Sequence, residues 1–177
     1  KTMNNPIWQE TYKLRQMDAD RASSMIQDGM QVFISGNSAV PTIILNAFEK
    51  VLPERQGIKL IQPFTAGRAT YLDEKFQNNL RVNSLFISPN IRDAINNGLA
   101  DFTPVFLSEL PLLFKKGILP LDICILHLSP PNEEGFCTLG TDAGLMRTAA
   151  ENARLRIAQI NPQMPATCGD TLIHISN

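Results

Sequence analysis

Leu121–Leu128 reads LDICILHL and decides the fold of this chain. Apolar residues fill most of the stretch, without a regular alternation of apolar and polar side chains. Such a run predicts a strand that is buried on both faces, and strands of that kind lie inside parallel sheets covered by helices. Shorter strand-like runs lie on both sides of it, at residues 31–35, 58–62, 83–87, 102–107, 136–139, 155–160 and 171–176.

Helical patterns separate most of these predicted strands. Ala22, Met25 and Ile26 lie at helical spacing after Asp18 and Asp20, whose carboxylates suit the start of a helix. The alternation of strands and helices predicts an α/β fold with an open, mostly parallel sheet covered by helices. Further helices are expected at residues 42–54, 90–98, 110–116 and 143–153, with a short helix inside the polar segment 63–83.

The composition excludes several classes of function. The chain has 177 residues, enough for one domain, of which 44% are hydrophobic and 19% charged. The net charge is −1 and no basic block is present, so we expect no nucleic acid partner. No apolar run approaches the roughly 20 residues of a membrane span. The N-terminal stretch KTMNNPIWQETYKLRQM also lacks the apolar segment of a signal peptide, so we expect no membrane association.

Cysteine and histidine residues give no sign of a metal centre. Cys124, Cys137 and Cys168 are odd in number and widely spaced, which predicts neither a disulfide framework nor a zinc site. Cys124 lies in the apolar run and is expected in the core. His127 and His174 lie in strand-like runs, without further ligands at suitable spacing. We therefore expect free thiols, no metal and a cytoplasmic location.

The first candidate site is the segment GNSAVP, which follows the predicted strand 31–35. Open α/β sheets bind ligands beyond the carboxyl ends of their strands. Small residues there let a ligand approach the backbone, and N–H groups at the next helix start can hold an anion or an oxyanion. The segment is no dinucleotide or P-loop motif, and an ordinary strand-to-helix turn is the alternative. Its candidate ligand-binding residues are Gly36, Asn37, Ser38, Val40 and Pro41.

The second candidate site is Ser88, Pro89 and Asn90, between a predicted strand and a predicted helix. The alternative is that Asn90 only caps the helix. Farther along, Glu133 and Glu134 follow the buried strand, but adjacent carboxylates on a loop are usually solvated. The residues alone therefore identify no catalytic group.

The third candidate site follows the predicted strand 155–160 and contains the sequence NPQMP. Two prolines around a methionine make a stiff, extended segment, which could frame a binding cleft. A structural crossover between elements is the alternative, since loops serve both purposes. The candidate residues are Asn161, Met164, Pro165, Gly169 and Asp170.

Two long segments carry a resemblance to a known family. The first begins at Asn83 and reads NSLFISPNIRDAINNGLADFTPVFLSELPLLFKKGILPLDICILHLSPPNEEGFCTLG. The second begins at Ile160 and reads INPQMPATCGDTLIHIS. Together they resemble the N-terminal domain of the acetyl-CoA hydrolase/transferase family, which includes 4-hydroxybutyrate coenzyme A transferases. The similarity extends from Trp8 to Asn177.

The resemblance implies a reaction that this chain does not complete alone. Residues 1–177 would be the N-terminal CoA-transferase domain, one half of a two-domain CoA-transferase fold, and the C-terminal catalytic half would be absent. In the family, a glutamate of that half attacks an acyl-CoA thioester, and the released thiolate converts the anhydride to a glutamyl-CoA thioester. An acceptor carboxylate then takes the CoA. The resemblance thus implies CoA transfer between an acyl-CoA and a small carboxylic acid such as 4-hydroxybutyrate, butyrate or acetate. CoA is a substrate, no cofactor is expected, and no catalytic residue is assigned to this chain.

Other interpretations stay open beside this one. A hydrolase on the same scaffold would pass the acyl group to water, and a non-catalytic module or one subunit of a two-chain enzyme would lack the chemistry. Because the chain stops just after a strand-like run, we expect a cut at a domain boundary. We also expect the C-terminal half as a partner, a large apolar patch where it docks, and a homo-oligomer.

The resemblance implies that the three candidate sites line the acyl or acceptor side of a cleft between the two halves. Two departures from the family pattern bear on this expectation. Ala166 stands where members usually have arginine. Asn37 and Ser38 stand where a second glycine is common. A role for that arginine, or for close backbone approach at the loop, therefore does not transfer directly.

Overall fold

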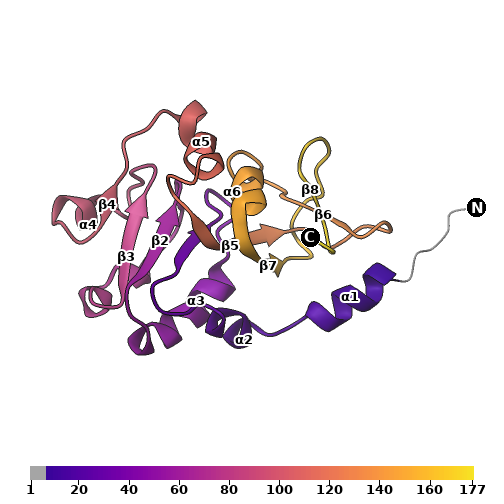
Figure 1. Cartoon of the computed structure of the whole chain (residues 1–177), viewed down its shortest axis with the longest axis horizontal. Helices are drawn as coiled ribbons and strands as arrows, with labels where there is room; N and C mark the ends of the chain where they lie inside the picture. The colour runs from indigo at the N-terminus through magenta and orange to yellow at the C-terminus, as the bar shows by residue number, and fades with distance from the viewer. Residues whose placement is uncertain (1–6) are drawn as a thin grey trace, which may run out of the picture.

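Six parallel strands form the main sheet (Figure 1). The computed structural model describes residues 7–177, and the first residues of the stretch expected to hold no signal peptide lie outside this part. The strand order across the sheet is β4-β3-β2-β1-β5-β7. The predicted α/β fold, with a parallel sheet covered by helices, is confirmed. Its strands are β1 (Gln31–Ile34), β2 (Ile58–Gln62), β3 (Leu80–Ser84), β4 (Asp101–Phe102), β5 (Leu121–Leu128) and β7 (Ala153–Ile160).

Strand β5 lies inside the sheet, as its apolar run predicts. It pairs in parallel with β1 on one side and with β7 on the other. Ile123 and Ile125 enter one hydrophobic core, whereas Cys124 and Leu126 enter a second core. Both faces of the strand are therefore covered, which explains why the run shows no polar alternation.

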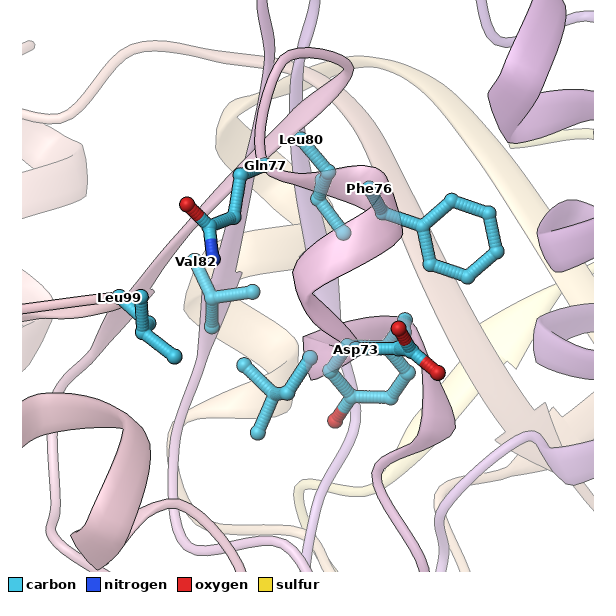
Figure 2. A pocket seen from close by; sticks show the side chains of 8 residues that line it. Asp73, Phe76, Gln77, Leu80, Val82 and Leu99 are labelled. Carbon is cyan, nitrogen blue, oxygen red and sulfur yellow. The ribbon is translucent and has the colours of Figure 1, made fainter. Parts of the chain in front are cut away.

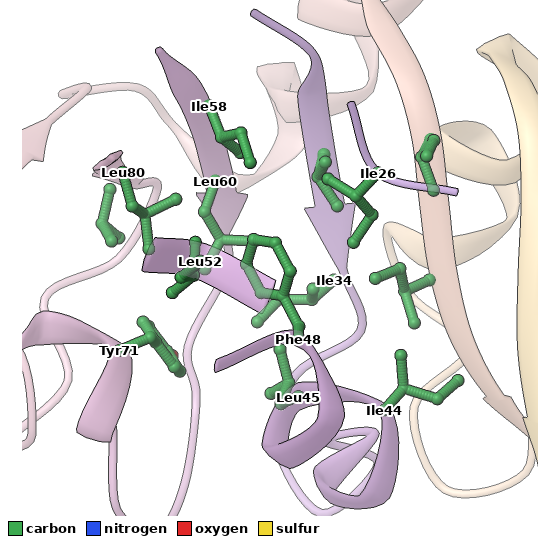
Figure 3. Close-up of a cluster of buried hydrophobic side chains, with 14 of the residues drawn as sticks. Ile26, Ile34, Ile44, Leu45, Phe48, Leu52, Ile58, Leu60, Tyr71 and Leu80 are labelled. Atoms are coloured by element: carbon green, nitrogen blue, oxygen red, sulfur yellow. The ribbon is translucent and has the colours of Figure 1, made fainter. Parts of the chain in front are cut away.

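Helices pack on both faces of the sheet. α2 (Ala19–Ser24) and α3 (Thr42–Val51) cover the first core, where Phe48 of α3 packs with Ile34 and Leu60 of the sheet (Figure 3). α5 (Leu110–Lys115) and α6 (Met146–Asn152) cover the second core. The chain also forms α4 (Arg92–Asn96) and four 3₁₀ turns, at Leu52–Glu54, Thr70–Leu72, Glu74–Phe76 and Leu107–Glu109.

The start of α2 confirms one local prediction. The backbone N–H of Arg21 donates to the Asp18 carboxylate at 2.7 Å, so Asp18 is the N-cap. An N-cap carboxylate satisfies one of the N–H groups that the first helical turn leaves unpaired.

A small second sheet forms near the end of the chain. β6 (Phe136–Thr138) and β8 (Leu172–His174) pair antiparallel, outside the main sheet. α1 (Ile7–Arg15) is attached to this unit, because the Arg15 guanidinium donates to the carbonyl of Ile175 at 2.6 Å. The Trp8 ring lies against Gly135, where a Cβ atom would come within 2.8 Å of the indole. The first described helix and the last strand are therefore neighbours.

Two strands differ from their predicted positions. β3 spans Leu80–Ser84 instead of 83–87, because Leu80 and Val82 supply the buried face of an alternating strand whose other face is polar. Phe86, which was predicted within the strand, lies beyond it and is 55% exposed. β4 holds only two residues instead of spanning 102–107. The N–H of Thr103 donates to the carbonyl of Ser84, which is the last residue of β3, so β3 offers no further residues for pairing.

Candidate functional site

The carboxyl ends of the parallel strands meet at one edge of the main sheet, here called the carboxyl edge. From β1 the chain proceeds outward to β2, β3 and β4, and it then returns to β5 and β7 on the other side of β1. The topological switch point therefore lies between β1 and β5, where open α/β sheets bind ligands. Residues 36–41 follow β1 directly and lie at this point.

Two hollows elsewhere in the described residues are weaker candidates. The hollow beside Phe76, Leu80 and Leu99 has a volume of about 10 Å³, roughly the space of one water molecule (Figure 2). A surface hollow of about 220 Å³ lies between α6 and β8. Its Arg147 already forms ion pairs with two carboxylates, at 2.9 and 2.6 Å. The loops of the carboxyl edge are the better candidate site.

The loop of residues 36–41 is fitted tightly against the loop that follows β2. The N–H of Asn37 donates to the carbonyl of Phe64 at 2.7 Å. A Cβ atom on Gly36 would lie 2.3 Å from the same carbonyl oxygen. On the other side, the N–H of Gly36 donates to the buried Asp142 carboxylate at 3.2 Å. The small residue at position 36 thus makes room for the neighbouring loop, whereas the sequence predicted that a ligand would approach the backbone there.

The third candidate segment is joined to this loop by side chains. The Ser38 hydroxyl donates to Thr141 Oγ1 at 2.9 Å, and the Thr141 hydroxyl contacts Met164 Sδ at 3.8 Å. Met164 is buried, and its N–H donates to the carbonyl of Asn161 at 2.9 Å. Its sulfur occupies the place of a side chain at Gly140, where a Cβ atom would lie 2.2 Å away.

The stretch Gly140, Thr141 and Asp142 was not among the predicted site residues. Each of them contacts a predicted one: Gly140 and Thr141 contact Met164, and Asp142 holds Gly36. The sequence offered one signal, because a glycine directly after the predicted strand 136–139 is typical of a turn. The partners of that turn could not be seen in the sequence.

The second candidate segment braces the loop after β2. The Ser88 hydroxyl donates to Asn90 Oδ1 at 2.6 Å, and Asn90 Nδ2 donates to the carbonyl of Gly67 at 3.0 Å. Asn90 Nδ2 also lies 3.4 Å from Thr65 Oγ1, and Thr65 forms a parallel bridge with Asn37. The interpretation of Asn90 as a helix cap is wrong, because α4 has Ile91 at its N-cap position. Pro89 is exposed beside it.

The remaining predicted residues lie at the margins of this cluster. Val40 is half-buried against the first core, and Pro41 is the N-cap residue of α3. Pro165 is exposed directly after Met164. Gly169 has a φ angle of 85° with open space around it, and Asp170 forms its ion pair with Arg147 of α6. The structure thus connects loops from all three candidate sites, whereas the contacts of Asp170 point toward α6.

At the carboxyl edge, exposed polar side chains lie above buried side chains that hold their loops in place. Asn37, Ser38 and Thr141 are exposed, whereas Asp142 and Met164 beneath them are buried. Hydroxyl and amide groups on such a surface can orient a carboxylate or a carbonyl oxygen by hydrogen bonds. The arrangement is suited to binding and orientation.

The two buried thiols, Cys124 and Cys137, are not activated nucleophiles. Burial raises the pKa of the Cys137 thiol to about 11, and it raises the pKa of Cys124 further. A thiolate is the reactive form, so both groups are inert near neutral pH. Glu133 and Glu134 are exposed on their loop, as predicted. Neither the buried thiols nor this exposed glutamate pair is arranged for covalent chemistry.

The acetyl-CoA hydrolase/transferase N-terminal domain matches residues 1–177 of the chain. The chain belongs to this family. A 4-hydroxybutyrate coenzyme A transferase of Clostridium kluyveri is 36% identical over 170 residues. A succinyl-CoA:acetate/propanoyl-CoA:succinate CoA transferase of Fasciola hepatica is 39% identical over 162 residues. These matches cover 96% and 90% of this chain but only 40% and 34% of the relatives, so the chain spans well under half of their length.

Solved structures agree with the family assignment. A 4-hydroxybutyrate CoA-transferase of Porphyromonas gingivalis is similar with a TM-score of 0.80 and 29% identity, over 96% of this chain and 39% of that one. RipA of Yersinia pestis reaches a TM-score of 0.87 at 23% identity, which supports the fold alone. Within residues 7–177 no helix has the length and apolarity to cross a bilayer. The same residues hold no cluster of three or more side chains suited to binding a metal ion.

Proposed function

We propose that the chain is the N-terminal part of an enzyme that transfers CoA between an acyl-CoA and a small carboxylic acid, of the 4-hydroxybutyrate, butyrate or acetate type. The observation that carries the proposal is the match of the whole chain to the N-terminal domain of the family. The names of the similar proteins, which are CoA transferases, support transfer over hydrolysis.

The geometry of the carboxyl edge supports a role of this chain in binding substrates. Ser38 and Thr141 offer hydroxyl groups on the surface, held by Asp142 and Met164 below. Such groups can bind and orient the acyl or acceptor side of the substrates. The reactive carboxylate would come from polypeptide beyond this chain.

The reaction that the family resemblance implies needs no further reagent. A glutamate carboxylate attacks the thioester carbonyl and expels the CoA thiolate, which leaves an acyl-glutamyl anhydride. The thiolate attacks the glutamyl carbonyl, releases the first carboxylate and forms a glutamyl-CoA thioester. The acceptor carboxylate repeats these steps in reverse and leaves as its CoA thioester. CoA is thus a substrate, and the proposed chemistry requires no separate cofactor.

Exposed apolar side chains support a docking partner. Phe106 and Leu107 are 76% and 77% exposed, between β4 and α5. Phe86 is also exposed and packs edge-on against Phe64, whose carbonyl accepts the N–H of Asn37. Apolar groups next to a proposed site are expected where a second domain or subunit covers it. We propose that the C-terminal half docks here and that the complete enzyme is a homo-oligomer. Three free cysteines suit a cytoplasmic location.

The test uses the full-length enzyme with butyryl-CoA or acetyl-CoA as donor and 4-hydroxybutyrate as acceptor. We expect CoA exchange with ping-pong kinetics, and a CoA adduct of the enzyme detectable by mass spectrometry in the absence of acceptor. Release of free CoA without acceptor would instead identify a hydrolase. Sequential kinetics without an adduct would contradict the mechanism, and the absence of both activities would favour a non-catalytic module.

A further inference from the structure

Helix α3 begins at the proposed site without a capping side chain of its own. Its N-cap residue is Pro41, which makes no side-chain cap hydrogen bond. The N–H groups of Ile43 and Ile44 both donate to Oε1 of Gln159, at 3.0 and 3.4 Å. The first turn of a helix usually finds this acceptor within one residue of its start. Here it comes from β7, more than one hundred residues later in the chain.

The orientation of Gln159 depends on His127. The two residues are direct register partners of β7 and β5, and Gln159 Nε2 lies 3.3 Å from His127 Nε2. Because Gln159 Oε1 accepts from the helix, its amide NH₂ faces the imidazole as a donor. His127 Nε2 must then accept, which requires a neutral ring with its proton on Nδ1.

The surroundings of His127 fit a neutral ring. The side chain is 9% exposed, and removal from water disfavours the charged form of the ring. Burial lowers the pKa of the imidazole, and the backbone of Val40 and Ala39 only partly opposes this shift. A protonated ring would present a second donor to the Gln159 amide and break the contact.

The loop of residues 36–41 is therefore fixed at both ends by side chains from other strand ends. At its start, the N–H of Gly36 donates to Asp142 at 3.2 Å. At its end, Gln159 holds the first turn of α3, and the N–H of Leu45 donates back to the carbonyl of Pro41 at 3.0 Å. Ser38 lies between these two anchors.

We propose that Gln159, oriented by neutral His127, is a positioning residue that fixes the start of α3 and thereby the loop that carries Ser38. The consequence for catalysis rests on the proposed function, whereas the consequence for the loop does not. Loss of Gln159 should release the α3 end of the Ser38 loop, whereas the bonds of Gly36, Asn37 and Ser38 to other loops remain. The effect should then appear in the mobility of the loop and in turnover.

The experiment compares three variants of the full-length protein with the wild type. Gln159→Met keeps the side-chain length but removes the carbonyl oxygen and the NH₂ group that form the hydrogen bonds. Gln159→Glu keeps an acceptor for Ile43 and Ile44, where negative charge at a helix start is favourable, and its carboxylate favours a protonated His127 that donates to it. Gln56→Met is the matched control, because Gln56 is exposed at the opposite, amino edge of the sheet.

Amide hydrogen exchange over residues 36–44 is the first readout. We expect exchange about tenfold faster in Gln159→Met, within about threefold of wild type in Gln159→Glu, and unchanged in Gln56→Met. The second readout is kcat/KM for CoA exchange, which should fall about tenfold in Gln159→Met and recover in Gln159→Glu. His127→Phe leaves Gln159 without its orienting acceptor and should give about threefold effects.

Three outcomes would overturn the proposal. Unchanged exchange over residues 36–44 in Gln159→Met is the first, and failure of Gln159→Glu to restore slow exchange is the second. The third is a lower Tm combined with wild-type kcat/KM well below that temperature, which would indicate a purely structural cap. If Gln159→Met does not fold, His127→Phe decides by the same two readouts. A wild type without CoA exchange would refute the proposed function, and the exchange data would still test the positioning role.

Discussion

Two pairs of glycines, one pair at each edge of the main sheet, serve different purposes. At the amino edge, Gly29 and Gly117 have φ angles of 73° and 65°, and a Cβ atom on either would meet nothing within 4 Å. At the carboxyl edge, a Cβ atom on Gly36 would lie 2.3 Å from the Phe64 carbonyl oxygen, and one on Gly140 would lie 2.2 Å from a methionine sulfur. Gly29 and Gly117 reverse the chain locally, whereas Gly36 and Gly140 fit one loop to another. The proposed site is thus a set of interdependent loops.

Among the variants that test this difference, Gly36→Ala should lower the stability of the protein most. Its methyl group would meet a backbone oxygen, which cannot rotate away as the end of a side chain could. We expect the free energy of unfolding to fall by about 3 kcal/mol, the upper range for overpacking a buried position. Urea unfolding of the full-length protein, followed by circular dichroism, measures the change.

Gly117→Ala is the control for that experiment. Position 117 has open space but a left-handed backbone, so the expected cost is about 1 kcal/mol. Equal costs at positions 36 and 117 would contradict the difference between the two edges.

Gly140→Ala tests whether the carboxyl-edge loops depend on each other. The new methyl group would meet Met164 Sδ and Cγ, which are parts of a flexible side chain. We expect a loss of about 2 kcal/mol, from the contact and from the φ angle of 60°. In a Met164→Ala background the contact disappears, and the same substitution should cost only about 1 kcal/mol. Strict additivity in this double-mutant cycle would show that the two loops are independent.

The sheet was predictable from the sequence where the apolar pattern is strong. The run Leu121–Leu128 is a strand with the bounds expected from its composition, because both of its faces are buried. β3 was displaced in the prediction because its apolar residues Leu80 and Val82 alternate with Arg81 and Asn83. Arg81 forms an ion pair with Asp101 of the neighbouring edge strand, and both side chains are exposed to solvent.

The candidate site was predictable only as a set of strand ends. Residues 36–41, 88–90 and 161–165 were expected after strands, and parallel pairing places those strand ends at one edge. The contacts between the loops could not be predicted, because they join residues far apart in the chain. Ser38 and Thr141 are separated by 103 positions, and Ile43 and Gln159 by 116. No local pattern marks a glutamine as the cap of a distant helix.

The buried His127 side chain should make the stability of the protein depend on pH. Burial lowers the pKa of its imidazole in the native protein, whereas the unfolded chain titrates near the usual value of about 6.5. The unfolded state therefore binds more protons between these two values, and stability is lost as the pH falls from about 6.5 toward the lower native pKa. Because a single proton is involved, the free energy of unfolding changes by at most about 1.4 kcal/mol per pH unit.

Urea midpoints between about pH 5 and pH 7 measure that slope. His127→Phe should flatten it, whereas His174→Phe should leave the contribution of His127 in place. A slope that is identical in the wild type and in His127→Phe would show that the buried imidazole does not account for the acid sensitivity.

Ser38→Ala should have the smallest effect on stability and separates folding from function at the carboxyl edge. The side chain is exposed, and its hydrogen bond to Thr141 Oγ1 competes with water, so the expected loss is below about 0.5 kcal/mol. Ser24→Ala is the matched control, because Ser24 is also exposed and its hydroxyl donates to the Arg21 carbonyl in α2. Both variants should unfold like the wild type. Only Ser38→Ala should raise the KM for the acceptor carboxylate, by about threefold, since one hydrogen bond to substrate is lost. Equal KM values in the two variants would remove Ser38 from the binding surface and leave its hydroxyl as a simple loop contact.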